Sequence, residues 1–470
     1  DQGGECDLQD QAMAYGRGGS RYDENKRAVD DKNMGPLVKT IMTRCIQCTR
    51  CVRFVAEVAG VEEIGMISRG ENAEITTYLE KSLTSELSGN VIDLCPVGAL
   101  TSKPYAFNER PWELRKASSI DIMDAMGAAI RVDAKGDGVM RILPETNEEV
   151  NEEWISDKSR FVWDGLARQR LDKPYVRTNG KLSPVTWGEA FAAAKTALSV
   201  PAEKIGVVAG DLVEVEQAKA ALDMFRTLGV QNTDCRPAGA SYGADSVRER
   251  YILNPTLMGV EEADALLLIG TNPRVEAAVW NARIRKSWLW GELKVGVIGQ
   301  AADLTYEYDH LGTGGDALAN IADGDFYNVL KNAKRPMIVV GEGALCREDG
   351  QAILAAAQRL ALDVGAVTDG WAGFGVLHNA AGRVGALDVG FVPGENGKST
   401  SDILGDGLET IVLLGADEAD LSALGGATVI YVGSHGDAGA ARADIILPCA
   451  TYTEMNATYV NTEGRVQMTS

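Results

Sequence analysis

The chain has 470 residues, too many for one hydrophobic core, so we expect two to four domains. Its formal net charge of −21, from 46 basic and 67 acidic residues, argues against nucleic-acid binding and against docking on an anionic membrane surface. The sequence holds no apolar run of about 18 residues, so we expect no direct membrane span.

The cysteines are unevenly spread along the chain. Five of the eight lie within the first 95 residues, whereas secreted disulfide scaffolds are smaller and denser in cysteine, so we expect a reducing compartment. Residues 1 to about 35 are rich in Gly, Asp and Gln, and Asp1–Asp10 predicts a loop that opens into a short helix. Cys6 is isolated there, and such a cysteine is more often a buried thiol than a ligand. The chain starts without methionine, and we interpret it as a segment of a longer protein.

Three cysteines at a spacing of three residues, followed far downstream by a Cys-Pro pair, predict a [4Fe–4S] cluster. A C-x2-C-x2-C loop can wrap three iron corners, and the fourth thiolate then comes from another part of the chain. The proline has no N–H and a fixed φ, so it turns the chain away after the fourth ligand. The predicted ligands are Cys45, Cys48, Cys51 and Cys95.

The flanks of this loop agree with an anionic cluster. Arg44, Arg50 and Arg53 surround it in sequence, and guanidinium groups would stabilise the negative charge of a cubane with four thiolates. Residues 52–58 predict a helix that starts at the last loop cysteine, where a helix N-terminus favours an anion. The alternatives are a zinc site or four unrelated buried thiols. Zinc sites ordinarily use two C-x2-C pairs, or cysteine with histidine, and the sequence has no second pair.

Residues 113 to about 170 predict a small β subdomain. The segments 130–134 and 139–143 alternate in polarity around residues 135–138, which is typical of a β-hairpin. A boundary is expected at residues 171–174.

From about residue 180, short apolar runs alternate with alanine-rich helical stretches. This alternation indicates a parallel sheet covered on both faces, so the predicted fold class is α/β. We expect two such units, at about 200–330 and 335–450. The helix candidates are residues 214–228 and 351–362. The strand candidates are residues 205–209, 265–269, 294–298, 337–340, 411–414 and 429–432.

Nearly all of these runs end at glycine. Ligands in such folds bind at the carboxyl ends of the strands, so these glycines indicate either a cofactor cleft or ordinary loop geometry. Gly341 and Gly343 form half of a dinucleotide fingerprint, but Cys346 stands at the position of the third glycine. The three histidines are isolated and are interpreted as surface or core residues, and the remaining cysteines are scattered along the chain. They are His310, His378, His435, Cys235 and Cys449.

Several stretches, spread over essentially the whole chain, match one family. They are residues 1–10, 42–51, 85–103, 154–158, 270–274 and 459–465. They closely resemble the large iron–sulfur subunit of respiratory complex I, the NADH:quinone oxidoreductase. The resemblance implies a [4Fe–4S] cluster-binding region at 1–112 and a small β subdomain at 113–170. It also implies a doubly wound, molybdopterin-oxidoreductase-like α/β region at 171–470.

The resemblance implies three iron–sulfur clusters in the complete subunit. A [2Fe–2S] cluster belongs to an N-terminal ferredoxin-like domain that is absent from this sequence. A second [4Fe–4S] cluster is held by one histidine and three cysteines; Cys6 matches the last of these, and the others would precede Asp1. The third is the [4Fe–4S] cluster of Cys45, Cys48, Cys51 and Cys95.

The remainder of the chain resembles molybdopterin oxidoreductases such as formate dehydrogenase. Those enzymes commonly carry another [4Fe–4S] cluster in the small β domain, and its matching positions here are Asp121, Asp124, Ala128 and Ser156. None is cysteine, and alanine in the set argues against any metal. We therefore predict neither that cluster nor a molybdopterin on this chain.

The function implied by the resemblance is that of an electron-relay subunit in a proton-pumping translocase. Electrons would pass from the flavin site through [4Fe–4S] clusters toward quinone, and no substrate site is expected on this chain. The implied partners are other hydrophilic-arm subunits, including the flavin-bearing NADH-binding subunit and downstream iron–sulfur subunits. The implied location is the peripheral arm, on the cytoplasmic face of the bacterial or the matrix face of the mitochondrial inner membrane. A working molybdopterin oxidoreductase and a structural zinc protein are the rival hypotheses.

Overall fold

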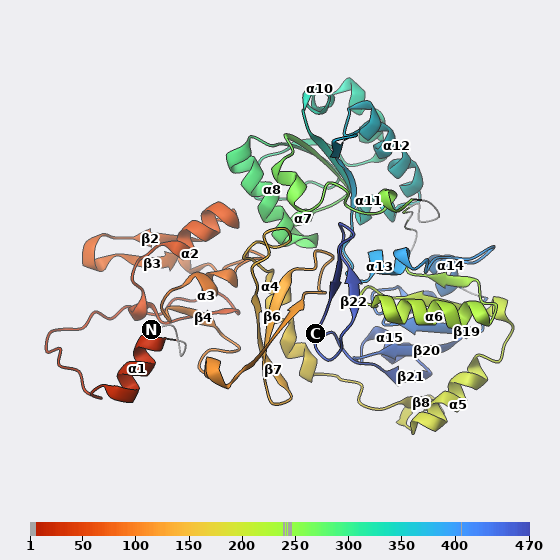
Figure 1. Ribbon diagram of the computed structural model, residues 1–470, viewed down its shortest axis with the longest axis horizontal. Coiled ribbons are helices and arrows are strands. Elements are labelled where there is room, and N and C mark those ends of the chain that lie inside the picture. The colour runs from red at the N-terminus through yellow and green to blue at the C-terminus, as the bar shows by residue number, and fades with distance from the viewer. Residues whose placement is uncertain (1–5, 238–239, 241, 243–246, 406) are drawn as a thin grey trace.

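The computed structural model describes residues 6–237, 240, 242, 247–405 and 407–470. Figure 1 shows the N-terminal region on one side of a small central β subdomain, and two larger α/β units on the other. The C-terminus returns to the central subdomain, where the Ser470 N–H donates to Ser119 Oγ at 3.3 Å. Among the described helices, none has the length and hydropathy needed to cross a bilayer.

The N-terminal region is built from short elements around a small apolar core that includes Met34, Val38, Phe54 and Val91. Strand β1 pairs antiparallel with β4, and β2 pairs antiparallel with β3. Helix α2 continues through one wider turn at Phe54–Val58, so the helix predicted after the last loop cysteine is present. The bounds are α1 Asp7–Tyr15, β1 Val38–Thr40, α2 Arg50–Arg53, β2 Ile64–Ile67, β3 Glu74–Thr77, α3 Asn90–Leu94 and β4 Leu100–Ser102.

The central β subdomain is a three-stranded antiparallel sheet in the order β5-β6-β7, followed by the short helix α4. Its core packs Ile120, Ile130 and Ile142 against Tyr452 and Tyr459 from the end of the chain. The bounds are β5 Arg115–Ile120, β6 Ala129–Lys135, β7 Gly138–Pro144 and α4 Asp157–Phe161. The predicted hairpin therefore corresponds to β6 and β7.

One α/β unit contains a seven-stranded sheet in the order β11-β10-β19-β20-β21-β8-β9. Its pairings are parallel except that β8 pairs antiparallel with both β21 and β9. Its β10 and β19 are buried along their whole length, as expected for strands covered on both faces. The bounds are β8 Tyr175–Thr178, β9 Lys181–Pro184, α5 Trp187–Ala197, β10 Ile205–Ala209, α6 Val215–Thr227, β11 Asn232–Asp234, α14 Thr400–Leu404, β19 Thr410–Leu414, β20 Thr428–Gly433, α15 Ala438–Arg442 and β21 Ile445–Pro448.

The other unit contains a five-stranded parallel sheet in the order β14-β13-β12-β15-β18. The chain runs outward from β12 in both directions, so the strand order reverses between β12 and β15. The bounds are β12 Ala265–Ile269, α7 Pro273–Glu276, α8 Ala278–Gly291, β13 Lys294–Ile298, β14 Asp309–Gly312, α9 Gly315–Ala319, α10 Asp325–Asn332, β15 Pro336–Gly341, α11 Glu342–Leu345, α12 Gly350–Asp363 and β18 Phe374–Leu377. Helix α13, Arg383–Asp388, follows β18 but packs on α6 of the seven-stranded unit. Two small hairpins complete the fold: β16 Val367–Thr368 with β17 Trp371–Ala372, and β22 Thr458–Val460 with β23 Val466–Met468.

The predicted strands and helices of the α/β region are confirmed, but the predicted division into consecutive units at 200–330 and 335–450 is wrong. Strand β10 pairs with β19, so the seven-stranded sheet combines residues before 235 with residues after 409. The five-stranded sheet is inserted between them. Apolar runs identify buried strands, but the pairing of distant strands leaves no local signal in the sequence.

Candidate metal centre

The four cysteines predicted as ligands surround one cavity, here called the four-cysteine cavity. Cys45 follows a short helical turn, Cys51 lies in the first turn of α2, and Cys95 directly follows α3. The cavity between these side chains has a volume of about 20 Å³. The rest of the lining is mostly apolar: Met42, Ile46, Thr49, Arg50, Ile75, Pro96, Val97, Ala99 and Leu100.

The backbone of the loop is bent at the residues between the cysteines. Gln47 has φ of 51° and Thr49 has φ of 60°, a left-handed conformation that costs energy for residues with a Cβ. These turns leave Cys45, Cys48 and Cys51 facing the same cavity, and the Gln47 N–H donates to Cys45 Sγ at 3.4 Å. The loop therefore has the shape that a cluster with several thiolate ligands requires.

The thiols of this cavity are buried close together. All eight cysteines lie in the described residues, and each is a reduced thiol. Burial, followed by the neighbouring Cys95, raises the pKa of Cys51 to about 12, and burial also raises the pKa of Cys45. The Cys95 thiol donates to the Val97 carbonyl oxygen at 2.9 Å. Because iron binds the thiolate form, loading the site with metal would release these protons.

The positive charges near the loop differ in part from the prediction. Arg50 lines the four-cysteine cavity, whereas the Arg44 guanidinium lies 5.5 Å from the Phe107 ring centroid and Arg53 is exposed. Arg27, which the sequence did not indicate, is close enough to Cys45 to oppose the rise in pKa that burial causes at that thiol. Its guanidinium donates to the carbonyls of Glu71 and Ala73 at 3.0 and 2.7 Å, long-range bonds with no local sequence signal.

A single metal ion and a cluster differ in how closely the ligands must converge. Within the described residues, no three His, Cys, Asp or Glu side chains converge on a point that would hold one metal ion. A tetrahedral zinc site needs sulfur atoms about 2.3 Å from the ion. The four thiols line one cavity, and their C-x2-C-x2-C and Cys-Pro pattern is the one that binds a [4Fe–4S] cluster.

Cys6 lies outside this cavity. It precedes α1 as the N-cap residue, and its carbonyl oxygen accepts the Asp10 N–H at 3.0 Å. Residues 1–5, which belong to the loop predicted from the sequence, lie outside the described residues. The assignment of Cys6 to a second cluster therefore stays a prediction.

The positions predicted to replace the ligands of a further cluster do lie together in the central β subdomain. The Asp121 N–H donates to the Ala128 carbonyl at 2.8 Å, and Asp121 accepts from Ser159 Oγ at 2.6 Å. Ser159 Oγ in turn lies 2.8 Å from Ser156 Oγ. Burial, followed by the neighbouring Asp124, raises the pKa of Asp121 to about 7. A buried network of carboxyl and hydroxyl groups thus occupies this position.

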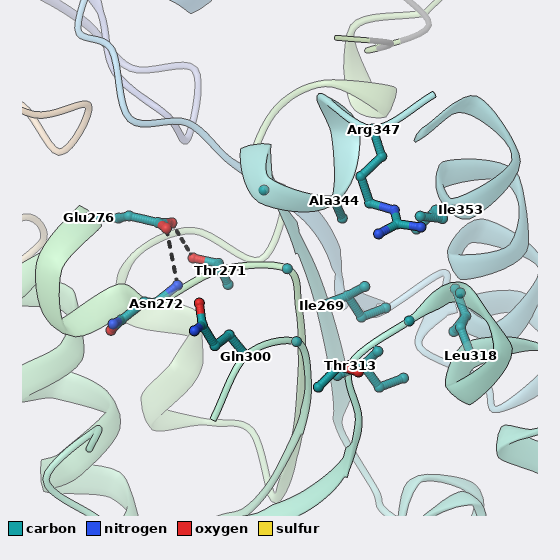
Figure 2. A pocket seen from close by; sticks show the side chains of 16 residues that line it. Ile269, Thr271, Asn272, Glu276, Gln300, Thr313, Leu318, Ala344, Arg347 and Ile353 are labelled. Atoms are coloured by element: carbon teal, nitrogen blue, oxygen red, sulfur yellow. Dashed lines mark hydrogen bonds between the residues drawn. The ribbon is translucent and has the colours of Figure 1, made fainter. Parts of the chain in front are cut away.

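The glycines that end the strands of the five-stranded sheet line a second cavity, of about 270 Å³, at the carboxyl ends of β12 and β13. Figure 2 shows Thr271, Asn272 and Arg347 around it. Its charged groups already have partners: Glu276 accepts from Thr271 Oγ1 at 2.5 Å, and Arg347 Nε donates to Asp349 at 2.6 Å. The place agrees with the predicted cleft, but nothing in this lining identifies a ligand.

The predicted histidines lie apart and bond to backbone or hydroxyl groups. His378 is fully buried and its Nε2 lies 2.5 Å from the Tyr251 carbonyl oxygen. His435 bonds to Ser434 Oγ, and His310 bonds to the Gly299 carbonyl. These contacts agree with their interpretation as core or surface residues.

Three family matches cover most of the chain. Residues 35–101, which include all four cavity cysteines, match the ferredoxin-like domain of NADH-quinone oxidoreductase subunit 3. Residues 114–164 match the 4Fe-4S domain of NADH-ubiquinone oxidoreductase NDSU1/NuoG-like proteins, although they contain no cysteine in this chain. Residues 170–470 match the molybdopterin oxidoreductase family.

Similar proteins extend this finding to the whole chain. The chain is 53% identical to the "NADH-ubiquinone oxidoreductase 78 kDa subunit, mitochondrial" of Neurospora crassa, with all of this chain and 64% of the relative covered. It is 50% identical to "NADH dehydrogenase [ubiquinone] iron-sulfur protein 1, mitochondrial" of Solanum tuberosum, covering 63% of it. It is also 50% identical to an NADH-quinone oxidoreductase subunit of the bacterium Rickettsia felis, covering 69% of it. Both of these matches include all of this chain.

The chain thus spans roughly two thirds of the length of these relatives, by the 63% to 69% covered. Among solved structures, acetylene hydratase from Pelobacter acetylenicus is similar in fold. The TM-score is 0.54 at 12% identity, with 76% of this chain and 66% of that chain covered. The sequence identity over the full chain and the matched iron–sulfur domains together show that the chain belongs to the family of the large iron–sulfur subunit of NADH:quinone oxidoreductase, respiratory complex I.

Proposed function

We propose that this chain is the electron-relay iron–sulfur subunit of a proton-pumping NADH:quinone oxidoreductase. The observation that carries the proposal is the four-cysteine cavity, in which Cys45, Cys48, Cys51 and Cys95 surround one mostly apolar space. The four thiols would hold a [4Fe–4S] cluster. Such a cluster supplies one-electron transfer when bound, at a potential set by hydrogen bonds, burial and charge.

The residues of the chain contribute the surroundings of that cluster. The apolar lining and the half-buried loop limit access of water, which protects thiolate-bound iron and shapes the potential. The Gln47 N–H at Cys45 Sγ and the nearby Arg27 guanidinium favour the charged form of Cys45. No substrate site is assigned to the chain, because its role is to hold and tune a carrier of electrons.

The remaining cofactors follow from the family. In the complete subunit, Cys6 would be one of four ligands of a second [4Fe–4S] cluster, and a [2Fe–2S] cluster would be held by an N-terminal domain. We assign the cluster-binding region to residues 1–112, the small β subdomain to 113–170, and the molybdopterin-oxidoreductase-like region to 171–470. Residues 121, 124, 128 and 156 offer no thiolate, so we place no cluster there and no molybdopterin in the α/β region.

The proposed partners are the other subunits of the hydrophilic arm. They include the flavin-bearing NADH-binding subunit, as the source of electrons, and the iron–sulfur subunits that lead to quinone. The proposed location is the peripheral arm, facing the bacterial cytoplasm or the mitochondrial matrix. The names of the similar proteins, which come from mitochondria and from a bacterium, support this assignment.

The test is a comparison of two activities of the assembled complex that carries Cys48→Ala. Oxidation of NADH by a small hydrophilic acceptor that reacts at the flavin needs no relay and should persist. Oxidation of NADH by quinone should be lost, because removal of one thiolate opens one iron corner. The matched control is Cys346→Ala, since Cys346 is exposed and lies outside the cavity. Full quinone reduction by the Cys48→Ala complex would contradict the proposed relay.

A further inference from the structure

The helix that delivers the fourth cysteine is too short to hold its own position. Helix α3 has five residues, Asn90–Leu94, and Cys95 follows it directly. Isolated helices shorter than about 12 residues are marginal in water. The position of Cys95 relative to the loop of Cys45–Cys51 therefore depends on contacts between α3 and the rest of the protein.

The main polar contacts of α3 come from α4 in the central β subdomain. The Asp157 carboxylate accepts the Gly89 N–H and the Ser88 hydroxyl, each at 2.6 Å. Gly89 is the N-cap residue of α3, so this carboxylate satisfies a donor at the start of the helix. The Asp157 N–H also donates to the Glu86 carbonyl at 2.8 Å, which joins the two chain segments in both directions.

A second contact reaches further along α3. Arg160 is 3% exposed, and its Nη2 donates to Asn90 Oδ1 at 3.2 Å and to Asp93 Oδ2 at 2.5 Å. The Asn90 side chain also pairs with the backbone of Ile155, donating at 2.9 Å and accepting at 3.2 Å. The charge-assisted bonds from Arg160 and to Asp157 are of the stronger kind found in proteins.

Helix α4 is itself fixed from the opposite side. Ser156 Oγ accepts the Ser159 N–H at 3.1 Å and thereby caps the helix. Ser159 Oγ donates to the buried Asp121 at 2.6 Å. The hydrogen bonds among Asp121, Ser156 and Ser159 therefore fix the position of α4, which in turn contacts α3.

The same segment also touches the helix that carries Cys51. The Trp154 ring packs on Phe54 with a centroid distance of 4.9 Å, and Phe54 directly follows α2. Residues 154–160 of the central β subdomain thus contact both the helix that contains Cys51 and the helix that precedes Cys95.

We propose that Asp157 and Arg160 are positioning residues for Cys95, which they hold at the distance from the cysteine loop that a single cubane needs. This proposal rests on the proposed function, since it takes the four cysteines to be cluster ligands. It assigns the central β subdomain, which has no cluster ligands of its own in residues 114–164, a role in setting the cluster of its neighbour.

The most selective variant is Gly89→Ala, which leaves every charge in place. Gly89 has φ of −63°, so alanine fits the backbone. Its Cβ, however, would lie 2.6 Å from Arg160 Cδ and 2.9 Å from Asp157 Oδ1, so the Arg160 and Asp157 side chains must shift relative to α3. The matched control is Gly65→Ala on β2, where a Cβ meets nothing within 4 Å.

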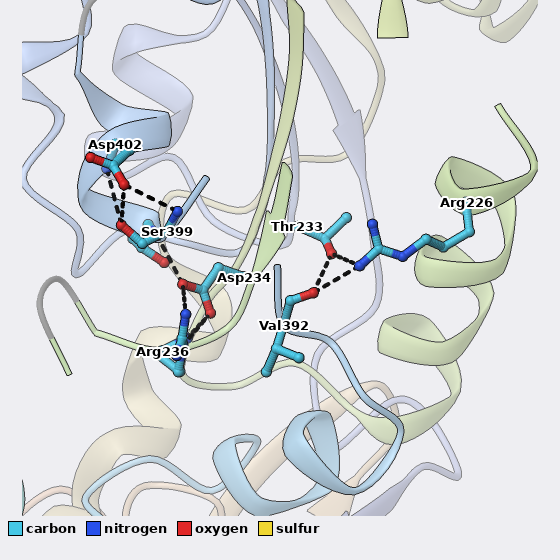
Figure 3. A network of polar contacts seen from close by, with 8 residues as sticks. Arg226, Thr233, Asp234, Arg236, Val392, Ser399 and Asp402 are labelled. Carbon is cyan, nitrogen blue, oxygen red and sulfur yellow. Dashed lines mark hydrogen bonds and ion pairs between the residues drawn. The ribbon is translucent and has the colours of Figure 1, made fainter. Parts of the chain in front are cut away.

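Asp157→Asn and Arg160→Lys test the two charged groups separately. Asp157→Asn removes the negative charge and can place an amide donor against the Gly89 N–H or the Ser88 hydroxyl. Arg160→Lys keeps the positive charge, but the shorter side chain does not extend as far toward Asn90 and Asp93. The matched control is Asp234→Asn. Figure 3 shows the Asp234 carboxylate bonded to Arg236. The same carboxylate accepts the Thr400 N–H at 3.0 Å, at the start of the short helix α14, which is remote in sequence from α3.

The experiment loads the full chain with iron and sulfide under anaerobic conditions. It then follows iron release to a chelator, the EPR spectrum of the reduced protein and the midpoint potential. For Gly89→Ala and Asp157→Asn we expect iron release about ten- to hundredfold faster than in the parent chain. We also expect a [3Fe–4S] EPR signal from protein that has lost the iron at Cys95, and altered g-values in the remaining cubane. Iron release from Arg160→Lys should be slower than from Arg160→Ala, because lysine keeps the positive charge.

A merely structural role predicts another pattern. The variants would then lower the thermal midpoint, as Asp234→Asn should, with unchanged g-values, potential and iron release, and that result would overturn the proposal while leaving the cluster assignment intact. Failure of the parent chain to bind about four irons would instead overturn the proposed function and this proposal with it. Should Asp157→Asn not fold, the comparison of Gly89→Ala with Gly65→Ala decides.

Discussion

The buried carboxyl of Asp121 predicts an unusual dependence of stability on pH. Asp121 is 1% exposed and accepts from Ser159 Oγ and from the Met123 N–H, with no cation bonded to it in the described residues. Burial, followed by repulsion from Asp124, raises its pKa from 3.8 to about 7. Lys158 and these hydrogen bonds oppose the rise but do not cancel it.

The sign and size of the effect follow from proton linkage. Between pH 3.8 and about 7 the folded protein keeps the proton of Asp121 while the unfolded chain has released it. The free energy of unfolding therefore falls with rising pH, and levels off above about 7. The interval of about three units corresponds to about 4 kcal/mol at about 1.4 kcal/mol per unit, as an upper limit.

Asp121→Asn removes this titration, and its amide oxygen can still accept from Ser159. We expect the variant to match the parent chain near pH 4 and to exceed its free energy of unfolding by up to about 4 kcal/mol at pH 8. Urea unfolding at the two pH values measures the difference. The control is Asp133→Asn, which leaves Arg131 and Arg141 without the carboxylate now 2.9 and 2.8 Å away, and should destabilise at both pH values. An Asp121→Asn protein less stable than its parent at pH 8 would contradict the raised pKa of Asp121.

Three further variants test the core, the strand ends and the N-terminal cysteine. Leu267→Ala removes a fully buried side chain from the central strand β12 and should lower the free energy of unfolding, measured in urea, by about 3 kcal/mol. Leu228 is exposed, so Leu228→Ala should change that free energy little. Equal effects of the two substitutions would contradict the burial of β12. Gly270→Ala should lower the free energy of unfolding by more than about 2 kcal/mol, because Gly270 has φ of +62° and a Cβ there would lie 2.5 Å from the Ala344 nitrogen. An unchanged urea midpoint would contradict this turn geometry. Cys6→Ser should leave the iron content of the 470-residue chain unchanged, and a loss of iron would show that Cys6 ligates a cluster without the residues expected before Asp1.

The ligand set was predictable because its chemistry is local. Three thiolates at a spacing of three and a Cys-Pro pair carry the geometry of a cubane, and the structure brings Cys45, Cys48, Cys51 and Cys95 to one cavity. The buried strands were predictable for a similar reason, since β12 and β19 are continuous apolar runs. The left-handed turns at Gln47 and Thr49 were not predictable, because neither residue is a glycine.

Contacts between segments that are distant in sequence were not predictable, because no local motif marks them. The insertion of one sheet into the other depends on the pairing of β10 with β19, which lie about 200 residues apart, as the register of Ile205 with Thr410 shows. The bonds of Asp157 and Arg160 to α3 join residues 67 to 70 positions apart, and Arg27 approaches Cys45 only through the fold. In each case the side chain is an ordinary polar residue in the sequence, and its role depends on tertiary packing.

The most direct test of the account is the metal content of the 470-residue chain after anaerobic loading with iron and sulfide. We expect about four irons and four sulfides per chain, broad absorption near 400 nm, and an EPR signal on reduction that Cys95→Ala abolishes or converts to a [3Fe–4S] signal. One bound zinc without sulfide, or a Cys95→Ala protein with unchanged iron content and EPR, would contradict the assignment of a single cubane to Cys45, Cys48, Cys51 and Cys95.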